Sequence, residues 1–197
     1  MKHCEMGRRC EHYPEAMSTS ACGEPLYHVN GKLIRELRPD LLITQAHCEV
    51  CAVTPSDVER SGACALPAEH ISLSASSLED IFQSIRQIAQ ALNLVEQGEI
   101  VVQRQQHHLD AVREKAARFS PPTVVMLEWT EPVFAMGNCG PELVEIANGK
   151  LRIGRKGEYP AAIPGEQLRK ADPEHLIVAP CGFNFERSLR ELTVLEQ

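Results

Sequence analysis

The sequence predicts an α/β fold built from two small lobes with parallel sheets, joined by a long backbone helix. Three observations favour this class. Short apolar strands alternate with helical segments, a long helical stretch occupies the middle of the chain, and a helix–turn–strand pattern near the start recurs near the end. The predicted divisions are an irregular segment over residues 1–25, an N-terminal lobe over 26–75, a helical linker over 76–120 and a C-terminal lobe over 121–197.

The composition is that of an ordinary soluble globular protein, with 43% hydrophobic and 24% charged residues. The formal net charge of −7 argues against nonspecific binding to nucleic acid or to an anionic membrane. The first residues, "MKHCEMGRRC", contain no apolar core of a secretion signal, so the sequence as it stands predicts a cytoplasmic location. Without such a signal, the eight cysteines are expected to be free thiols.

The first half of the chain contains one strand and one strongly patterned helix. Residues 31–44 predict a short helix that ends before Pro39, followed by a buried strand over 41–44. Residues 76–92 predict a helix in which Ser76 and Glu79 have the spacing of a capping box. Its apolar residues fall on one helical face, namely Leu78, Ile81, Phe82, Ile85, Ile88, Ala89 and Leu92.

A second helix is predicted over residues 95–118, because Pro121 and Pro122 end it firmly. The apolar segment 123–128 then predicts a buried strand, and a short helix follows Pro141 and stops at Gly149. Residues 165–182 can be laid over residues 31–48, with Gly165 on Gly31, Arg169 on Arg35, Pro173 on Pro39 and Ile177 on Ile43. The match predicts a strand over 176–179. It indicates an internal repeat or the similarity that any two αβ units share.

Three loops follow predicted parallel strands: Gln45–Cys51, Glu128–Cys139 and Pro180–Phe183. Such loops gather at the carboxyl edge of a sheet, where α/β proteins bind their ligands. The first loop holds a Cys-x-x-Cys pair with three open interpretations. A structural zinc site needs a second pair, which the sequence lacks, and a redox dithiol is disfavoured by Glu49 between the thiols. The third interpretation is that the pair lines a ligand cleft.

The second loop contains Trp129, the only tryptophan of the chain, in a segment shaped by glycine and proline. An aromatic side chain in such a loop suits a flat ligand, although a tryptophan that anchors the core fits equally well. Glu128 and Glu131 are interpreted as loop acids rather than as a catalytic pair. The sequence contains no phosphate-binding glycine loop, nucleophile elbow or zinc-protease motif, so we expect no catalytic residue and no resident metal.

Three blocks of the chain resemble, in the same order, blocks of the cobalamin-binding and iron-complex substrate-binding proteins of ABC transporters. The blocks are "LYHVNGKLIRELRPDLLITQAHCEVCAVTPSDVE", "VVMLEWTEPVFAMGNCGPELVEIANG" and "ADPEHLIVAPCGFNFERSLREL". The resemblance implies a class III periplasmic-binding-protein fold with the ligand in a cleft between the lobes. It also implies capture of cobalamin or a related metal chelate for delivery to a transporter permease, with no enzymatic activity and no required cofactor.

Carried over position by position, the resemblance implies a set of ligand-binding residues from both lobes. These are Gln45, Cys48, Glu49, Val50 and Cys51 from one lobe, and Glu128, Trp129, Asn138, Cys181, Gly182 and Phe183 from the other.

The chain departs from the family pattern at three places. The usual first strand and its loop are absent, Cys139 stands where the family has tryptophan, and the chain stops at Gln197 where relatives continue. We therefore expect a shortened member with an incomplete N-terminal lobe. Relatives are periplasmic or membrane-associated. Two alternatives to a substrate-binding protein stay open. One is a cytoplasmic thiol or metal-binding protein that uses Cys48, Cys51 and Cys181, and the other is a fragment without activity.

Overall fold

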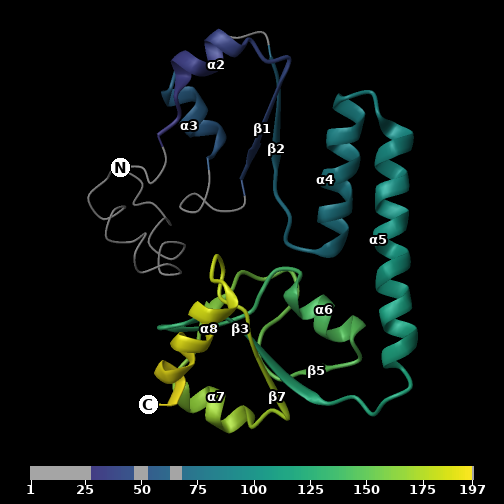
Figure 1. Ribbon diagram of the computed structural model, residues 1–197, viewed down its shortest axis with the longest axis vertical. Helices are drawn as coiled ribbons and strands as arrows, with labels where there is room; N and C mark the ends of the chain where they lie inside the picture. Colours follow the sequence, from purple (N-terminus) through teal and green to yellow (C-terminus); the bar gives the residue numbers. More distant parts are fainter. Residues whose placement is uncertain (1–27, 47–52, 63–67, 197) are drawn as a thin grey trace. The chain divides into compact units, whose positions relative to one another are not determined.

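The computed structural model describes residues 28–46, 53–62 and 68–196, drawn as ribbon in Figure 1. The chain forms two compact units. Unit 1 comprises residues 1–74 with 87–93, and unit 2 comprises residues 75–86 with 94–197.

The part of unit 1 that the structure describes before residue 75 contains a parallel pair of strands and two short helices. The strands pair from Leu41 opposite Glu69 to Gln45 opposite Leu73. The buried apolar residues of unit 1, among those described, are Val58, Ile71 and Ala89. The elements are α2 (Gly31–Leu37), β1 (Leu41–Gln45), α3 (Pro55–Arg60) and β2 (Glu69–Leu73).

The helices of unit 1 approach closely at Gly31. A Cβ atom at this position would lie 2.1 Å from the carbonyl oxygen of Ser61, which directly follows α3. The guanidinium of Arg35 spans the same contact and donates to the carbonyl oxygen of Gly62 at 3.1 Å. Glycine at residue 31 therefore permits the start of α2 to pack against the end of α3.

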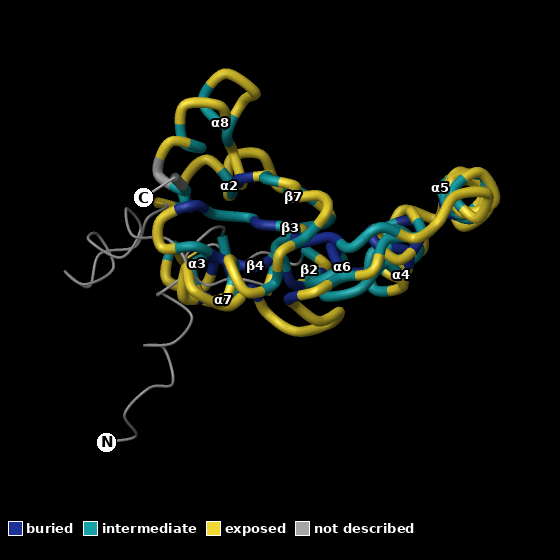
Figure 2. The backbone as a smooth tube through the Cα atoms, turned by 90° about the horizontal axis from the view of Figure 1, so that it is seen from below, coloured by how far each residue is buried: buried dark blue, intermediate teal, exposed yellow. Residues whose placement is uncertain are grey.

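The helical stretch consists of α4 (Leu78–Ala91) and α5 (Val95–Ala116), as predicted. Arg86 and Glu99 join the two helices through a 2.9 Å hydrogen bond. Only Gly98 and Val102 of α5 are buried, and most of this helix is exposed in Figure 2. No helix in the described ranges is long and apolar enough to span a membrane.

The cap of α4 lies one residue later than predicted. Asp80 accepts the backbone N–H of Ser77 at 2.9 Å, and the hydroxyl of Ser77 accepts the N–H of Asp80 at 3.1 Å. The reciprocal pair is thus Ser77 with Asp80 rather than Ser76 with Glu79. The choice was ambiguous because two serines precede two acids at the same spacing. The N–H and hydroxyl of Ser76 donate to the same carboxylate, which favours Asp80.

Unit 2 is organised around the long strand β3, none of whose residues is exposed and four of which are buried. This strand pairs in parallel with β5 and β7 and antiparallel with β4, and β4 pairs antiparallel with β6. The strands are β3 (Thr123–Thr130), β4 (Val133–Ala135), β5 (Lys150–Leu151), β6 (Ala161–Ala162) and β7 (His175–Val178).

The core of unit 2 is formed by Val125, Leu127, Ala135, Ile153 and Ile163, and Leu168 of α7 packs against it. The α/β fold class is confirmed, but this sheet is mixed rather than wholly parallel, because the predicted loop after β3 contains β4. The remaining elements are α6 (Gly140–Ile146), α7 (Gly165–Ala171), α8 (Phe185–Glu191) and the 3-10 helix η4 (Leu192–Glu196).

The predicted repeat has a structural counterpart. The helices α2 and α7 each span seven residues, and each is followed by a parallel strand. Their C-caps, Arg38 and Asp172, are aligned in the two sequences, and both adopt the left-handed conformation with φ of 48° and 39°. Pro39 and Pro173 come next and prevent either helix from continuing. The two segments therefore share local geometry as well as element order.

Candidate functional site

The carboxyl end of β3 carries an irregularity at Glu128. Leu127 pairs with Ala135, but Trp129 pairs with Phe134, so Glu128 is an extra residue in this strand. A bulge of this kind interrupts the alternation of side chains and redirects those that follow. Glu128 and Trp129 are in consequence both half-buried rather than one buried and one exposed.

The loop after β7 is held against the same end of β3. The N–H of Ala179 donates to the carbonyl oxygen of Leu127 at 2.9 Å, and that of Cys181 to the carbonyl oxygen of Glu128 at 3.4 Å. The chain then turns, and the N–H of Phe183 donates to the carbonyl oxygen of Pro180 at 3.2 Å. Gly182 has φ of 77°, as the third residue of a type II turn requires.

This turn brings Phe183 into contact with Trp129. The ring centroids are 4.9 Å apart and the ring planes are tilted by 57°, within the range of favourable aromatic pairs. The indole N–H of Trp129 donates to the carbonyl oxygen of Glu131 at 2.9 Å, which fixes the indole against the β3–β4 turn.

The start of α8 adds a cation to the two rings. Asn184 is the N-cap, and its side chain accepts the N–H of Arg187 at 2.8 Å. This geometry places the guanidinium of Arg187 at 3.6 Å from the centre of the Phe183 ring. We call Trp129, Phe183 and Arg187 the aromatic cluster. Sequence analysis missed Arg187, although its i, i+4 spacing from Phe183 across an N-cap could have indicated the contact.

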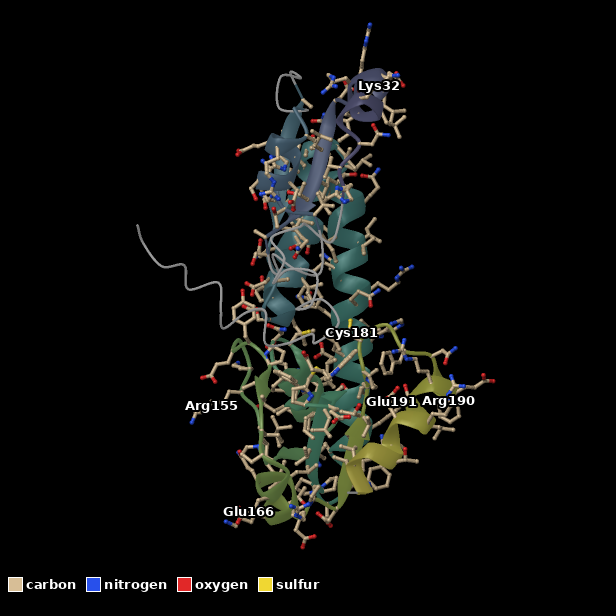
Figure 3. The ribbon with its side chains drawn as sticks, turned by 90° about the vertical axis from the view of Figure 1, so that its left-hand side faces the viewer. Lys32, Arg155, Glu166, Cys181, Arg190 and Glu191 are labelled. Carbon is tan, nitrogen blue, oxygen red and sulfur yellow. The ribbon has the colours of Figure 1, made fainter. Side chains whose placement is uncertain are left out.

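Two titratable groups near these elements are shifted by burial. Burial raises the pKa of the Glu128 carboxyl to about 7, so this side chain is part protonated near neutral pH. Burial, with a smaller contribution from Glu142, also raises the pKa of the Cys139 thiol. Cys181, by contrast, is exposed on the loop between β7 and α8 (Figure 3).

The structure therefore brings together Glu128, Trp129 and the turn formed by Cys181, Gly182 and Phe183. This neighbourhood follows from the parallel pairing of β3 with β7, as the sequence predicted for the loops after these strands. Gln45 ends β1 in unit 1, where its N–H donates to the carbonyl oxygen of Val53 at 3.4 Å. Cys48, Glu49, Val50 and Cys51 lie outside the described residues.

Asn138 is separated from this neighbourhood by the path of the chain. After β4 the backbone runs back along β3, where the N–H of Met136 donates to the carbonyl oxygen of Met126 at 2.8 Å. The N–H of Asn138 donates to the carbonyl oxygen of Glu158 at 2.7 Å, and its φ is 53°. Its Oδ1 atom is buried and accepts no hydrogen bond within the described part of the chain. Asn138 thus shapes the loop before α6.

Among the described residues, no three His, Cys, Asp or Glu side chains lie close enough together to hold a metal ion. The thiol and metal hypothesis uses Cys48, Cys51 and Cys181, of which only Cys181 is described, so it stays a prediction.

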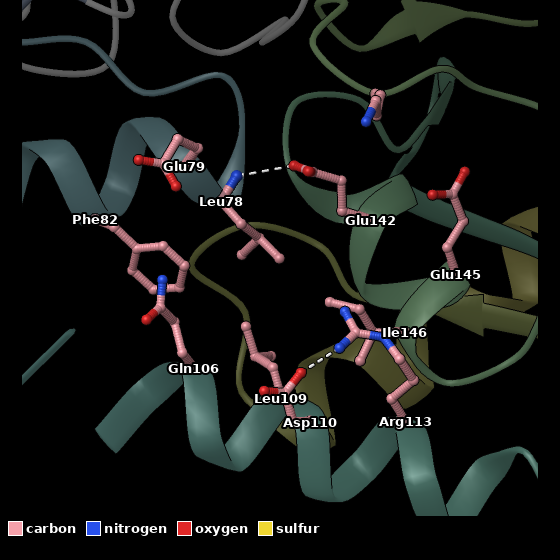
Figure 4. A pocket seen from close by; sticks show the side chains of 11 residues that line it. Leu78, Glu79, Phe82, Gln106, Leu109, Asp110, Arg113, Glu142, Glu145 and Ile146 are labelled. Atoms are coloured by element: carbon pink, nitrogen blue, oxygen red, sulfur yellow. Dashed lines mark hydrogen bonds and ion pairs between the residues drawn. The ribbon is translucent and has the colours of Figure 1, made fainter. Parts of the chain in front are cut away.

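A concave feature of unit 2, with a volume of about 550 Å³, lies between α4, α5 and α6. Its apolar residues include Phe82 and Leu109, and its rim is charged. Figure 4 shows that Glu142 accepts the N–H of Leu78 and that Asp110 pairs with Arg113. None of the predicted ligand-binding residues lines this pocket. The aromatic cluster, with Glu128 and Cys181 beside it on the chain, is therefore the stronger candidate site.

The model of the family described as periplasmic binding protein matches residues 32–196. The chain belongs to this family. A search of curated proteins finds no match. Solved structures of similar fold include an ABC transporter substrate-binding protein from Listeria monocytogenes EGD-e, with 20% identity and a TM-score of 0.65. The match covers 83% of this chain and 62% of that protein, so the chain spans less than two thirds of its length.

Two further solved structures of similar fold have ligands in their names. A periplasmic heme binding protein from Pseudomonas aeruginosa shares 18% identity at a TM-score of 0.64, covering 96% of this chain and 68% of that one. The periplasmic vitamin B12 binding protein of Vibrio cholerae shares 17% identity at a TM-score of 0.56, covering 86% and 68%. At these identities the likeness shows the fold, which confirms the class III periplasmic-binding-protein architecture predicted from the sequence.

Proposed function

We propose that this chain is the ligand-binding part of an ABC-transporter substrate-binding protein, and that it captures a flat metal chelate such as cobalamin or another tetrapyrrole. The single observation that carries the proposal is the contact between Trp129 and Phe183 at the carboxyl edge of β3 and β7. Rings held at such an edge offer an apolar surface to a planar ligand.

Three further features support this assignment. The family is one of binding proteins, and the solved structures of similar fold include ones named for heme and for vitamin B12. The half-buried carboxyl of Glu128 and the exposed thiol of Cys181 stand beside the rings along the chain and offer polar contacts. The proposed partner is a membrane permease that accepts the chelate from the binding protein, and the proposed role is non-enzymatic.

Ligand retention tests the proposal directly. The purified chain is mixed with hydroxocobalamin or with hemin, desalted, and examined for retained visible absorption. We expect stoichiometric retention of at least one of the two. Phe183→Ala should abolish retention, because it removes one ring of the cluster. Phe185→Ala is the matched control, because Phe185 lies two residues away and is 76% exposed on α8.

Absence of retained colour with both ligands would contradict the proposal, as would an equal loss in the two phenylalanine variants. Circular dichroism of each variant checks that α8 is retained. Metal analysis of the protein as purified tests the thiol alternative, which predicts bound zinc, whereas the binding-protein proposal predicts well under one equivalent. Cell fractionation tests the location. Delivery of a captured chelate to an uptake permease requires the protein outside the cytoplasm, so recovery in the cytoplasm, as the sequence predicts, would contradict this role.

A further inference from the structure

The guanidinium of Arg187 is stacked on one face of Phe183, and the same ring contacts Trp129. The cation therefore lies at one end of the two rings. Stacking uses the flat face of the guanidinium and leaves its N–H groups, which lie in the plane, directed away from the ring.

Most of those N–H groups are available to a ligand. In the described part of the chain, the ion pair of Arg187 is formed by its Nε atom with Glu191 at 4.0 Å, the outer limit for such a contact. The Arg187 side chain is 43% exposed. A guanidinium carries five N–H donors and matches a carboxylate in a bidentate manner. A carboxylate at the rim of a ligand stacked on the cluster would thus meet an oriented donor pair.

We propose that Arg187 is a specificity-determining residue that selects planar metal chelates with carboxylate groups at the rim over those whose rim carries neutral amides or esters. This inference rests on the proposed function and deepens it. Within the tetrapyrrole class, it favours an iron porphyrin with free propionates over a corrinoid, whose side chains are largely amides. The local sequence positions Arg187, because the Asn184 side chain accepts the N–H of Arg187 and so starts the helix that places Arg187 one turn after Phe183.

The test compares hemin with hemin dimethyl ester, which has the same ring and the same iron but no free carboxylate. Binding is followed by visible absorption. We expect the native chain to bind hemin at least about tenfold more tightly than the ester, as a charge-assisted bidentate contact provides. Arg187→Gln should bring this ratio close to one. Arg187→Lys should restore part of it, because lysine keeps the charge but not the planar fork.

Arg190→Gln is the matched control, because Arg190 lies on the same helix (Figure 3) and its replacement removes the same charge. It should leave the hemin-to-ester ratio unchanged. Equal affinities of the native chain for hemin and its ester would overturn the role of Arg187 and leave the proposed function standing. If hemin, the ester and hydroxocobalamin all fail to bind the native chain, both proposals fall. The ratio measured on the native chain decides the matter even if Arg187→Gln does not fold.

Discussion

Replacing Glu128 with glutamine should stabilise the protein at alkaline pH and leave its stability unchanged at acidic pH. Burial raises the pKa of the Glu128 carboxyl from 4.5 to about 7. The folded protein therefore binds this proton more tightly than the unfolded chain does. The carboxyl costs no stability below about pH 4.5, its cost grows as the pH rises toward 7, and the full cost is present above pH 7.

The size of the effect follows from the shift. Each pKa unit corresponds to 1.36 kcal/mol, which sets a ceiling of about 3 kcal/mol for the ionised form. Because Glu128 is only half-buried, solvent screening reduces the expected gain from Glu128→Gln to about 1–2 kcal/mol at about pH 8. Urea unfolding at about pH 5 and about pH 8 measures it. Glu131→Gln is the matched control, since Glu131 is exposed three residues further on. A difference between native and Glu128→Gln protein that is independent of pH would refute the reasoning.

Three other outcomes follow from the structure. Gly31→Ala should destabilise the protein by about 2–3 kcal/mol in urea unfolding, because its Cβ would overlap the carbonyl oxygen of Ser61. Gly165→Ala, at the aligned position of the repeat, should cost under about 0.5 kcal/mol because the nearest atoms are 3.8 Å away; equal costs would contradict this packing. Iodoacetamide should label the exposed Cys181 several-fold faster than Cys139, whose thiol pKa is raised by burial. Peptide mapping measures the two rates, and faster labelling of Cys139 would contradict the prediction. The thermal unfolding transition should be broad, because the described sheet of unit 1 has only two strands. A single sharp transition would contradict this expectation.

The elements that the sequence predicted carry local signals. Pro39 and Pro173 mark the turns between α2 and β1 and between α7 and β7, and the apolar face of residues 78–92 marks α4. Each signal depends on one helical face or one fixed backbone angle and needs no knowledge of distant partners. The expected helices over 77–92 and 95–118 are accordingly confirmed within two residues at each end.

Elements that depend on distant partners were missed. The strand β4 follows Pro132 in a segment rich in turn residues, and it exists because Phe134 and Ala135 pair with β3 on one side and β6 on the other. The strand β2 buries only Ile71 and has little alternating pattern. Strand pairing across the chain, rather than local propensity, determines both.

The candidate site was predictable to the extent that it follows from parallel strands. Pairing of β3 with β7 places Glu128 next to Cys181, and Phe183 follows through a two-residue turn. The bulge at Glu128 could not be predicted, because it depends on the register of β4. The stacking of Arg187 depends on the point at which α8 begins, which Asn184 sets.

Fluorescence of Trp129 tests the central claim, that a planar metal chelate binds against the aromatic cluster. Trp129 is the only tryptophan of the chain, so its emission reports on this position alone. Corrins and porphyrins absorb where tryptophan emits, and a bound chelate should quench the emission strongly by energy transfer. The account predicts quenching by hydroxocobalamin or hemin that saturates with ligand, and Trp129→Phe should remove the emission while weakening retention of the ligand only modestly. A purely linear loss of emission with added ligand, as inner-filter absorption alone produces, would show that neither chelate binds at this surface.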